Sequence, residues 1–228
     1  MPKTPPSGHR STKTRVKTAR KRTLSSTRWL ERQLNDPYVS RARREGYRSR
    51  AAYKIIELDE KFKFLKPGKT LLDLGAAPGG WTQVAVAKLR SEPADPKVIA
   101  VDILPMPGIN GAIVMQLDFM DDAAPEKIRA LIQGGVDIVL SDMAPNTTGH
   151  AATDHLRIMA LLEAAYPFAC EVLKKGGAFI AKVFQGGAEA AFLAQIKKDF
   201  ASVKHAKPKA SRSGSSEMYI VAMGFRGQ

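Results

Sequence analysis

The sequence predicts an α/β fold in which helices cover both faces of a mostly parallel, doubly wound β-sheet. Apolar runs with the length of strands alternate with helical segments from about residue 69 onward, and this alternation is typical of repeated strand–helix–strand units. The runs are continuously apolar, which indicates a sheet buried on both faces. A glycine-rich turn links the first run to the helix that follows it. In such sheets this turn is where nucleotide-like ligands bind.

The expected elements follow one another along the chain. A helix is expected over residues 49–62, where apolar side chains recur at helical spacing. The expected strands are TLLDLG (70–75), KVIAVDI (97–103), AIVMQLD (112–118), VDIVLSDM (136–143), AFIAKVF (178–184) and EMYIVAMGF (217–225). Further helices are expected around residues 80–89, 125–132, 152–173 and 188–200. The last strand follows a segment without a helical pattern, so we expect it to pair antiparallel to its neighbour.

Positive charge is concentrated at the N-terminal end of this 228-residue chain. Residues 1–50 hold 15 Lys and Arg against 3 Asp and Glu, which is +12 of the total net charge of +14. A segment so basic and so poor in apolar side chains cannot bury enough surface to fold alone. We therefore expect residues 1–27 to form a disordered basic tail. Residues 28–228 are expected to form one domain, with an N-terminal helical extension over about residues 28–66.

The expected partner of this basic segment is a nucleic acid, because its charge density suits phosphate neutralisation. An anionic membrane surface is the weaker alternative, since no amphipathic lipid-facing helix accompanies the charge. No apolar run approaches the roughly 20 residues needed to cross a bilayer, and the first residues lack the apolar centre of a signal peptide. We therefore expect a cytoplasmic protein without a membrane partner.

Cysteine and histidine usage argues against disulfides and metal ions. The single cysteine, Cys170, cannot form an internal disulfide. The histidines are scattered along the chain without the spacing of metal ligands; they are His9, His150, His155 and His205. We therefore expect no metal site.

The glycine-rich turn favours a cationic nucleoside over a dinucleotide. Against the dinucleotide fingerprint G-x-G-x-x-G, the turn has Gly75, Ala77 and Gly80, so the central glycine that admits a pyrophosphate is missing. Asp73 ends the strand beside the turn, where a carboxylate repels phosphate and attracts positive charge. S-adenosylmethionine, which carries an ammonium and a sulfonium but no phosphate, fits this turn. A tight turn without a ligand is the alternative.

Two further acids end the next two strands. Asp102 closes the second strand, where a carboxylate can accept hydrogen bonds from ribose hydroxyls. Asp118 closes the third strand and could accept a hydrogen bond from an adenine amino group. Each acid could instead cap a turn, but three acids at successive strand ends of one sheet favour a ligand. Trp81 opens the helix after the turn and either lines the ligand pocket or packs that helix.

Four charged residues are expected near the same edge of the sheet. Asp142 ends the fourth strand, and Lys182 lies near the end of the fifth among apolar neighbours. Glu217 begins the antiparallel last strand and therefore lies at that edge too. Lys54, on the helix before the sheet, is only weakly placed by this argument. Charged residues are rarely buried without partners, so the acids on this edge make a functional lysine the better interpretation of Lys182 than an aliphatic stem that snorkels to solvent.

Several motifs together resemble a known family. They are SRAAYK, DLGAAPGGWTQ, VDILPM, LDFM, SDMAPN, AKVFQG and SSEMYIVA. The region from about residue 41 to 225 resembles the FtsJ family (RrmJ, RlmE) of ribosomal RNA large subunit 2'-O-methyltransferases. Those enzymes have a Rossmann-like fold and depend on S-adenosylmethionine.

The resemblance implies a catalytic tetrad of Lys54, Asp142, Lys182 and Glu217, with Lys182 at its centre. It implies cofactor contacts from Gly79, Trp81, Asp102, Asp118 and Asp142, to which the argument above adds Asp73. It also implies a substrate, namely the 2'-hydroxyl of a uridine in 23S rRNA on the large ribosomal subunit. Independently of the resemblance, we expect a monomer.

Alternatives remain open at this stage. Lys182 acts either as a general base or as a charged group that stabilises the developing alkoxide. The target could instead be tRNA or a messenger RNA cap, and the chain could be a non-catalytic RNA-binding or ribosome-assembly protein. A nicotinamide-dependent dehydrogenase is disfavoured by Ala77 and Asp73. A base amino-methyltransferase is disfavoured because DMAPN lacks the aromatic residue that stacks on a flipped base.

Overall fold

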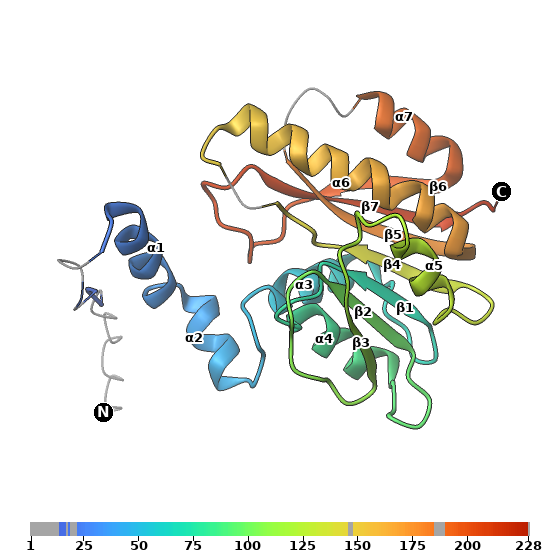
Figure 1. Ribbon diagram of the computed structural model, residues 1–228, viewed down its shortest axis with the longest axis horizontal. Helices are drawn as coiled ribbons and strands as arrows, with labels where there is room; N and C mark the ends of the chain where they lie inside the picture. The colour runs from blue at the N-terminus through green and yellow to red at the C-terminus, as the bar shows by residue number, and fades with distance from the viewer. Residues whose placement is uncertain (1–13, 17, 19–21, 146–147, 185–189, 228) are drawn as a thin grey trace, which may run out of the picture.

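The computed structural model describes residues 14–16, 18, 22–145, 148–184 and 190–227 (Figure 1). The helices are α1 (Leu24–Leu34), α2 (Pro37–Arg44), α3 (Ala52–Phe62), α4 (Gly80–Leu89), α5 (Ala124–Arg129), α6 (Ala151–Val172) and α7 (Ala190–Asp199). The strands are β1 (Leu71–Leu74), β2 (Val98–Asp102), β3 (Ala112–Gln116), β4 (Val136–Ser141), β5 (Leu173–Phe184), β6 (Phe200–Ala206) and β7 (Glu217–Phe225). Among the described residues, no helix is both long and apolar enough to cross a membrane.

Seven strands of the described chain form one sheet in the order β3-β2-β1-β4-β5-β7-β6. The pairs from β3 to β5 are parallel, and β7 pairs antiparallel with both β5 and β6. The predicted α/β class, with a mostly parallel doubly wound sheet and an antiparallel last strand, is confirmed.

One strand, β6, differs from the prediction. The helix expected to run to residue 200 ends at Asp199, and Phe200 begins β6 at the edge of the sheet. Most of β6 is partly or fully exposed, and only its first and last residues are buried. An edge strand buried on few positions has no continuous apolar run. The sequence therefore lacks the pattern that predicts the other strands.

Helices cover both faces of the sheet, as Figure 1 shows. On one face, Ile55 of α3 and Val84 of α4 pack in a buried cluster with Leu140 of β4. On the other face, Leu162 of α6 packs in a second cluster with Val139 of β4. Successive residues of a strand point to opposite faces, so a buried strand between two helical layers is apolar at nearly every position.

The register of the parallel strands brings their carboxyl ends to one edge. Leu74 at the end of β1 pairs with Val101 of β2 and with Ser141 of β4. The residues that follow these partners are Asp102 and Asp142, so both acids lie beside the glycine-rich turn after β1.

An arm of two helices precedes the sheet domain, and Figure 1 shows it at one side of that domain. The Thr23 hydroxyl accepts a hydrogen bond from the Ser26 N–H at the start of α1. The Asp36 carboxylate accepts one from the Tyr38 N–H at the start of α2. Both are N-cap contacts. Residues 24–27 of the expected tail are thus helical, while residues 1–13, 17 and 19–21 of it lie outside the described part of the chain.

The close approach of backbone at Gly75 gives a stability prediction. Gly75 has φ +78°, and an added Cβ would lie 2.6 Å from the Met143 backbone nitrogen. Gly68 has φ +80°, but an added Cβ there would have no atom within 4 Å. Gly68→Ala should cost about 1–2 kcal/mol for the left-handed backbone alone. Gly75→Ala should cost clearly more, because backbone atoms must also move apart.

Urea unfolding of both variants, compared with the unsubstituted protein, checks this difference. Equal losses in the free energy of unfolding would show that the contact between Gly75 and Met143 does not constrain the turn.

Candidate functional site

The register of β5 and β7 brings the predicted catalytic residues together. Lys182 pairs with Tyr219, and Phe184 pairs with Glu217. Directly paired residues share a face of the sheet, and so do residues two apart on one strand. Tyr219 and Glu217 therefore lie on the same face as Lys182. That face is covered by α3, which carries Lys54.

The four charged side chains form one connected group. Lys182 Nζ lies 3.0 Å from Asp142 Oδ1 and donates to the Asp142 backbone oxygen at 2.7 Å. Lys54 Nζ lies 2.8 Å from Glu217 Oε2 and 4.0 Å from Asp142 Oδ2. Both lysines are 8% exposed. Their charges are thus compensated by acids, as burial requires.

Tyr219 is a fifth member, which the sequence analysis does not identify. Its ring is fully buried. Its hydroxyl accepts a hydrogen bond from Lys54 Nζ at 3.1 Å and donates one to Asp142 Oδ1 at 2.9 Å. It thereby joins the two halves of the tetrad. The observation that could have identified Tyr219 is its position opposite Lys182. That position is known only once the antiparallel register of β5 and β7 is known.

The surroundings fix the protonation of these groups. Burial alone would raise the pKa of Asp142, but the charges of Lys182 and Lys54 and the hydrogen bonds from Lys182 and Tyr219 hold it below its ordinary value. Burial, together with the negative charges of Asp142 and Glu217, raises the pKa of Tyr219 well above 10. Asp142 is therefore ionised at neutral pH, and Tyr219 keeps its proton and can donate it in a hydrogen bond.

The glycine-rich turn after β1 lies beside the tetrad, and Gly79 and Asp102 fix its backbone. Gly79 has φ +106° and forms the N-cap of α4, and an added Cβ would lie 2.8 Å from Ile109 Cδ1. Asp102 accepts hydrogen bonds from the Ala77 N–H at 2.8 Å and from the Leu104 N–H at 2.7 Å. Asp102 therefore ties the turn after β1 to the turn after β2.

Asp118 and Trp81 have local partners. Asp118 Oδ1 accepts a hydrogen bond from the Met120 N–H at 2.9 Å, so it caps the turn after β3. The Trp81 indole N–H donates to the Ala51 carbonyl at 2.9 Å, and its ring centroid lies 5.6 Å from that of Tyr219. Trp81 is thus packed between the glycine-rich turn and the tetrad. The cofactor roles of both residues stay predictions.

Asp73 is the most deeply buried acid of the site. It has no exposed surface, and Thr82 Oγ1 donates to its Oδ2 at 2.7 Å. Its other oxygen, Oδ1, has no hydrogen-bond partner in the described part of the chain. Burial raises the pKa of Asp73 to about 7, against the opposing hydrogen bond from Thr82 and with the help of the nearby charges of Asp142 and Asp102. An unpartnered buried carboxylate oxygen fits a ligand that brings a positively charged donor.

Arg48 is a second residue that the sequence analysis does not identify. Its guanidinium donates to the Pro107 and Gly108 carbonyls, each at 2.6 Å, and to the Pro78 carbonyl at 3.4 Å. It therefore clamps the loop after β2 onto the glycine-rich turn.

Within the described ranges, no group of three or more His, Cys, Asp or Glu side chains is arranged to hold a metal ion.

Comparison with known proteins identifies the family of the chain. The FtsJ-like methyltransferase family matches residues 47–225, which include the turn and the whole tetrad. The chain belongs to this family. The fold and the family expected from the sequence motifs are thereby confirmed.

Similar proteins in the FtsJ family carry one name. The chain is 60% identical over 212 residues to "Ribosomal RNA large subunit methyltransferase E" of Rhodopseudomonas palustris strain BisA53, covering 93% of this chain and 90% of the relative. It is 57% identical over 218 residues to the protein of that name from Azorhizobium caulinodans, covering 96% of this chain and 91% of the relative. A crystal structure described as a ribosomal RNA methyltransferase from Plasmodium falciparum superposes with a TM-score of 0.70 at 34% identity, covering 80% of this chain and all of that one.

The raised pKa of Asp73 predicts how the stability of this FtsJ-family protein depends on pH. Folded Asp73 holds its proton up to about pH 7, whereas unfolded Asp loses it near about pH 4. Between these values the folded state binds more protons, so the free energy of unfolding falls as pH rises, by at most about 1.4 kcal/mol per pH unit for one group.

In Asp73→Asn this fall should be smaller between about pH 5 and pH 7, because the titrating group is gone. Urea unfolding across this range measures the difference. An equal pH dependence in the two proteins would contradict the assignment.

Proposed function

We propose that this protein is an S-adenosylmethionine-dependent enzyme that methylates the ribose 2'-hydroxyl of a uridine in 23S rRNA on the large ribosomal subunit. The observation that carries this proposal is the pair of buried lysines, Lys54 and Lys182, held by Asp142 and Glu217 beside the glycine-rich turn. Membership of the FtsJ family and the name of its rRNA-modifying relatives support it.

The residues around the turn fit the proposed cofactor. Asp73 offers a buried carboxylate oxygen without a partner, which suits an ammonium or sulfonium charge. Asp102 and Asp118 stand at the ends of β2 and β3 as hydrogen-bond acceptors for ribose and adenine. Gly79 permits the left-handed backbone at the start of α4, where an added side chain would collide with Ile109 and Arg48. Asp142 would complete this set from the side of the tetrad.

When bound, S-adenosylmethionine supplies an electrophilic methyl group on a sulfonium that leaves as a neutral thioether. The chain must then align the ribose hydroxyl with that methyl group and stabilise the oxygen as it loses its proton. Lys182 is the residue best suited to this task. Two acceptors, the carboxylate and the backbone oxygen of Asp142, hold its Nζ, and an ammonium has three donors. The third N–H is proposed to point to the 2'-oxygen.

We propose that Lys182 works as a cation and not as a base. Lys182 Nζ lies 3.0 Å from Asp142 Oδ1 and donates to the Asp142 backbone oxygen, an arrangement in which an ammonium can donate to the 2'-oxygen and keep its protons. Lys54 and Glu217 form the second ion pair, and Tyr219 links it to Asp142, so the position of Lys182 is fixed indirectly by all of them. The hydroxyl proton passes to solvent water as the new carbon–oxygen bond forms.

The remaining parts of the proposal concern the partner. We propose that a monomer acts in the cytoplasm on the large subunit, and that the basic segment at the N-terminus adds contacts to RNA phosphates. Such contacts position a protein on its substrate without reading sequence.

The substrate prediction concerns which RNA accepts the methyl group. The protein should transfer radiolabelled methyl groups from S-adenosylmethionine to large subunits from a strain that lacks the enzyme, and not to subunits from the parent strain. Mapping the labelled nucleotide should find a 2'-O-methyluridine in 23S rRNA. Labelled tRNA or capped messenger RNA in place of large subunits would identify the other target, and no transfer to any RNA would contradict the enzymatic proposal.

Removing the central lysine should abolish transfer. Lys182→Ala is expected to lower the single-turnover rate by about 10²- to 10³-fold, as the loss of one electrostatic stabiliser of a transition state does, while cofactor binding persists, because its contacts lie on the tetrad side. Lys174→Ala is the matched control, since Lys174 lies on the same strand and pairs with Asp137 at the other end; it should leave the rate unchanged. Loss of cofactor affinity in Lys182→Ala would show that its role is misassigned.

A further variant separates a cation from a base. Arginine stays protonated at all accessible pH values, so Lys182→Arg should keep part of the rate that Lys182→Ala loses if charge is what matters. A rate that rises with pH in the unsubstituted protein, and is absent in Lys182→Arg, would instead make Lys182 a general base.

A further inference from the structure

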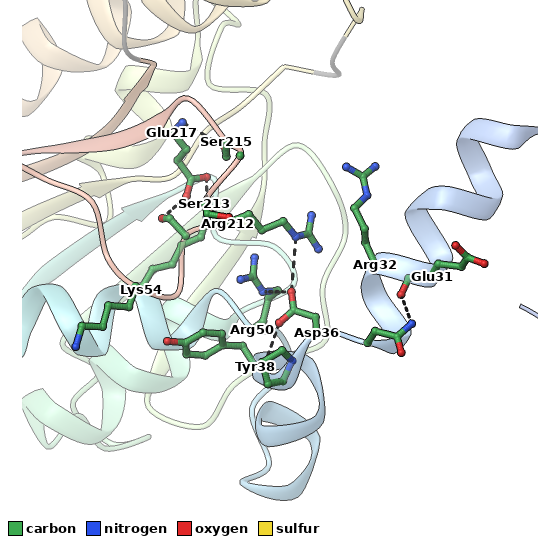
Figure 2. Close-up of a pocket in the computed structure, with 15 residues that line it drawn as sticks. Glu31, Arg32, Asp36, Tyr38, Arg50, Lys54, Arg212, Ser213, Ser215 and Glu217 are labelled. Carbon is green, nitrogen blue, oxygen red and sulfur yellow. Dashed lines mark hydrogen bonds and ion pairs between the residues drawn. The ribbon is translucent and has the colours of Figure 1, made fainter. Parts of the chain in front are cut away.

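A broad, open groove lies next to the tetrad. Its volume is about 1370 Å³, and Lys54 and Glu217 are among the residues that line it. Figure 2 shows these two side chains with those of the groove walls. Small-molecule pockets usually measure about 300–1,000 Å³, so the groove is larger than one small ligand requires. Its lining includes two members of the tetrad and none of the residues of the glycine-rich turn.

The groove has two walls from different parts of the chain. One wall is the loop between β6 and β7, with Lys209, Arg212 and Ser213. The other wall is the arm, with Arg32 at the end of α1 and Asp36 before α2. The family match begins at residue 47, so the arm wall lies outside the region that the family match covers.

Asp36 holds the two walls at a fixed distance. Its carboxylate caps α2 through the Tyr38 N–H, lies 2.9 Å from Arg50 Nε, and lies 3.6 Å from Arg212 Nε. Glu57 makes a second link, because it accepts hydrogen bonds from the Tyr38 hydroxyl and the Ala210 N–H, each at 3.1 Å. The two walls of the groove are therefore held together by specific side-chain contacts.

The charges of the lining favour a polyanion. The lining holds five basic side chains against three acidic ones, which are Glu31, Asp36 and Glu217. Glu217 is paired with Lys54, and Asp36 is held most closely by Arg50, so the lining keeps a net positive charge. Arg212 Nη2 is buried without a hydrogen-bond partner among the described residues, although Arg212 lines the groove. A buried guanidinium nitrogen without a partner suits a phosphate oxygen.

The lining offers little for reading bases. Tyr38 is its aromatic residue. The Tyr38 hydroxyl donates to Glu57, and the Arg50 guanidinium lies 5.7 Å from its ring centroid. Proteins that hold single strands by their bases present exposed aromatic platforms. A groove with charged groups and a covered ring suits the sugar–phosphate backbone instead.

We propose that this groove holds a single RNA strand by its backbone, with Arg32, Lys209 and Arg212 on successive phosphates, and that the strand carries the target ribose to Lys182. The inference rests on the proposed function and adds to it the path of the substrate. It gives the arm a specific task, which is to form the second wall against which the strand is held.

The test measures binding of undermethylated large subunits and its dependence on salt. Each contact to a phosphate that is lost should reduce the slope of log affinity against log salt by about 1. Arg32→Ala, Lys209→Ala and Arg212→Ala should each lower the affinity and the slope, and the double variant Arg32→Ala with Arg212→Ala should lower the slope by about 2. Cofactor affinity should not change, because none of the three residues belongs to the glycine-rich turn.

Lys127→Ala is the control for loss of one positive charge. Lys127 is exposed on α5 and does not line the groove, so this variant should bind like the unsubstituted protein. If Lys127→Ala weakens binding as much as the groove variants, the positive charge of the whole protein explains the binding, and the groove does not. If Arg32→Ala binds normally while Arg212→Ala does not, the arm is no part of the path.

The binding experiments test the groove separately from the proposed methyl transfer. Binding is measured without catalysis, so a protein that binds subunits through the groove but transfers no methyl group would overturn the proposed function alone. A protein that transfers methyl groups with unchanged salt slopes in all three variants would overturn the groove alone.

Discussion

The site is organised around the carboxylate of Asp142. It lies between two buried ammonium groups and accepts a hydrogen bond from Tyr219, while its own backbone oxygen accepts one from Lys182. Removing one partner of a buried ion pair leaves the other charge uncompensated, which costs more than the pair contributes. Asp142 is the carboxylate that pairs with Lys182, whereas Lys54 is paired more closely with Glu217. The end of β4 therefore sets where Lys182 can be buried as a charged group, beside the glycine-rich turn at the end of β1.

The strand-end acids show why single residues are weak evidence for a ligand. Asp102 and Asp118 both cap turns in the structure, which is the ordinary role of such residues. Asp102 also holds the glycine-rich turn through Ala77. A cap of this kind still shapes the turn, because it sets the positions of the backbone groups there. Asp73 differs from both, since one of its buried oxygens has no partner in the described chain.

The fold and most of the tetrad were predictable because their signals are local. Continuous apolar strands, a glycine-rich turn and acids at strand ends need no knowledge of distant contacts. Glu217 became predictable from one topological step, the antiparallel last strand. Tyr219, Arg48 and β6 were not predictable in this way. Tyr219 resembles any core aromatic until its register opposite Lys182 is known, and Arg48 contacts carbonyls 30 or more residues away. Most positions of β6 are exposed, so its sequence lacks the apolar run that predicts a strand.

A short segment before and within α3 connects all parts of the site. Arg48 clamps the loop after β2 to the glycine-rich turn, and Arg50 pairs with Asp36 of the arm. The Ala51 carbonyl accepts the Trp81 indole N–H, and Lys54 pairs with Glu217. Because these contacts fall within seven residues, the segment cannot shift at the groove without straining the turn or the tetrad. Dense packing transmits such shifts. The glycine-rich turn, the arm and the tetrad are therefore mechanically joined through residues 48–54.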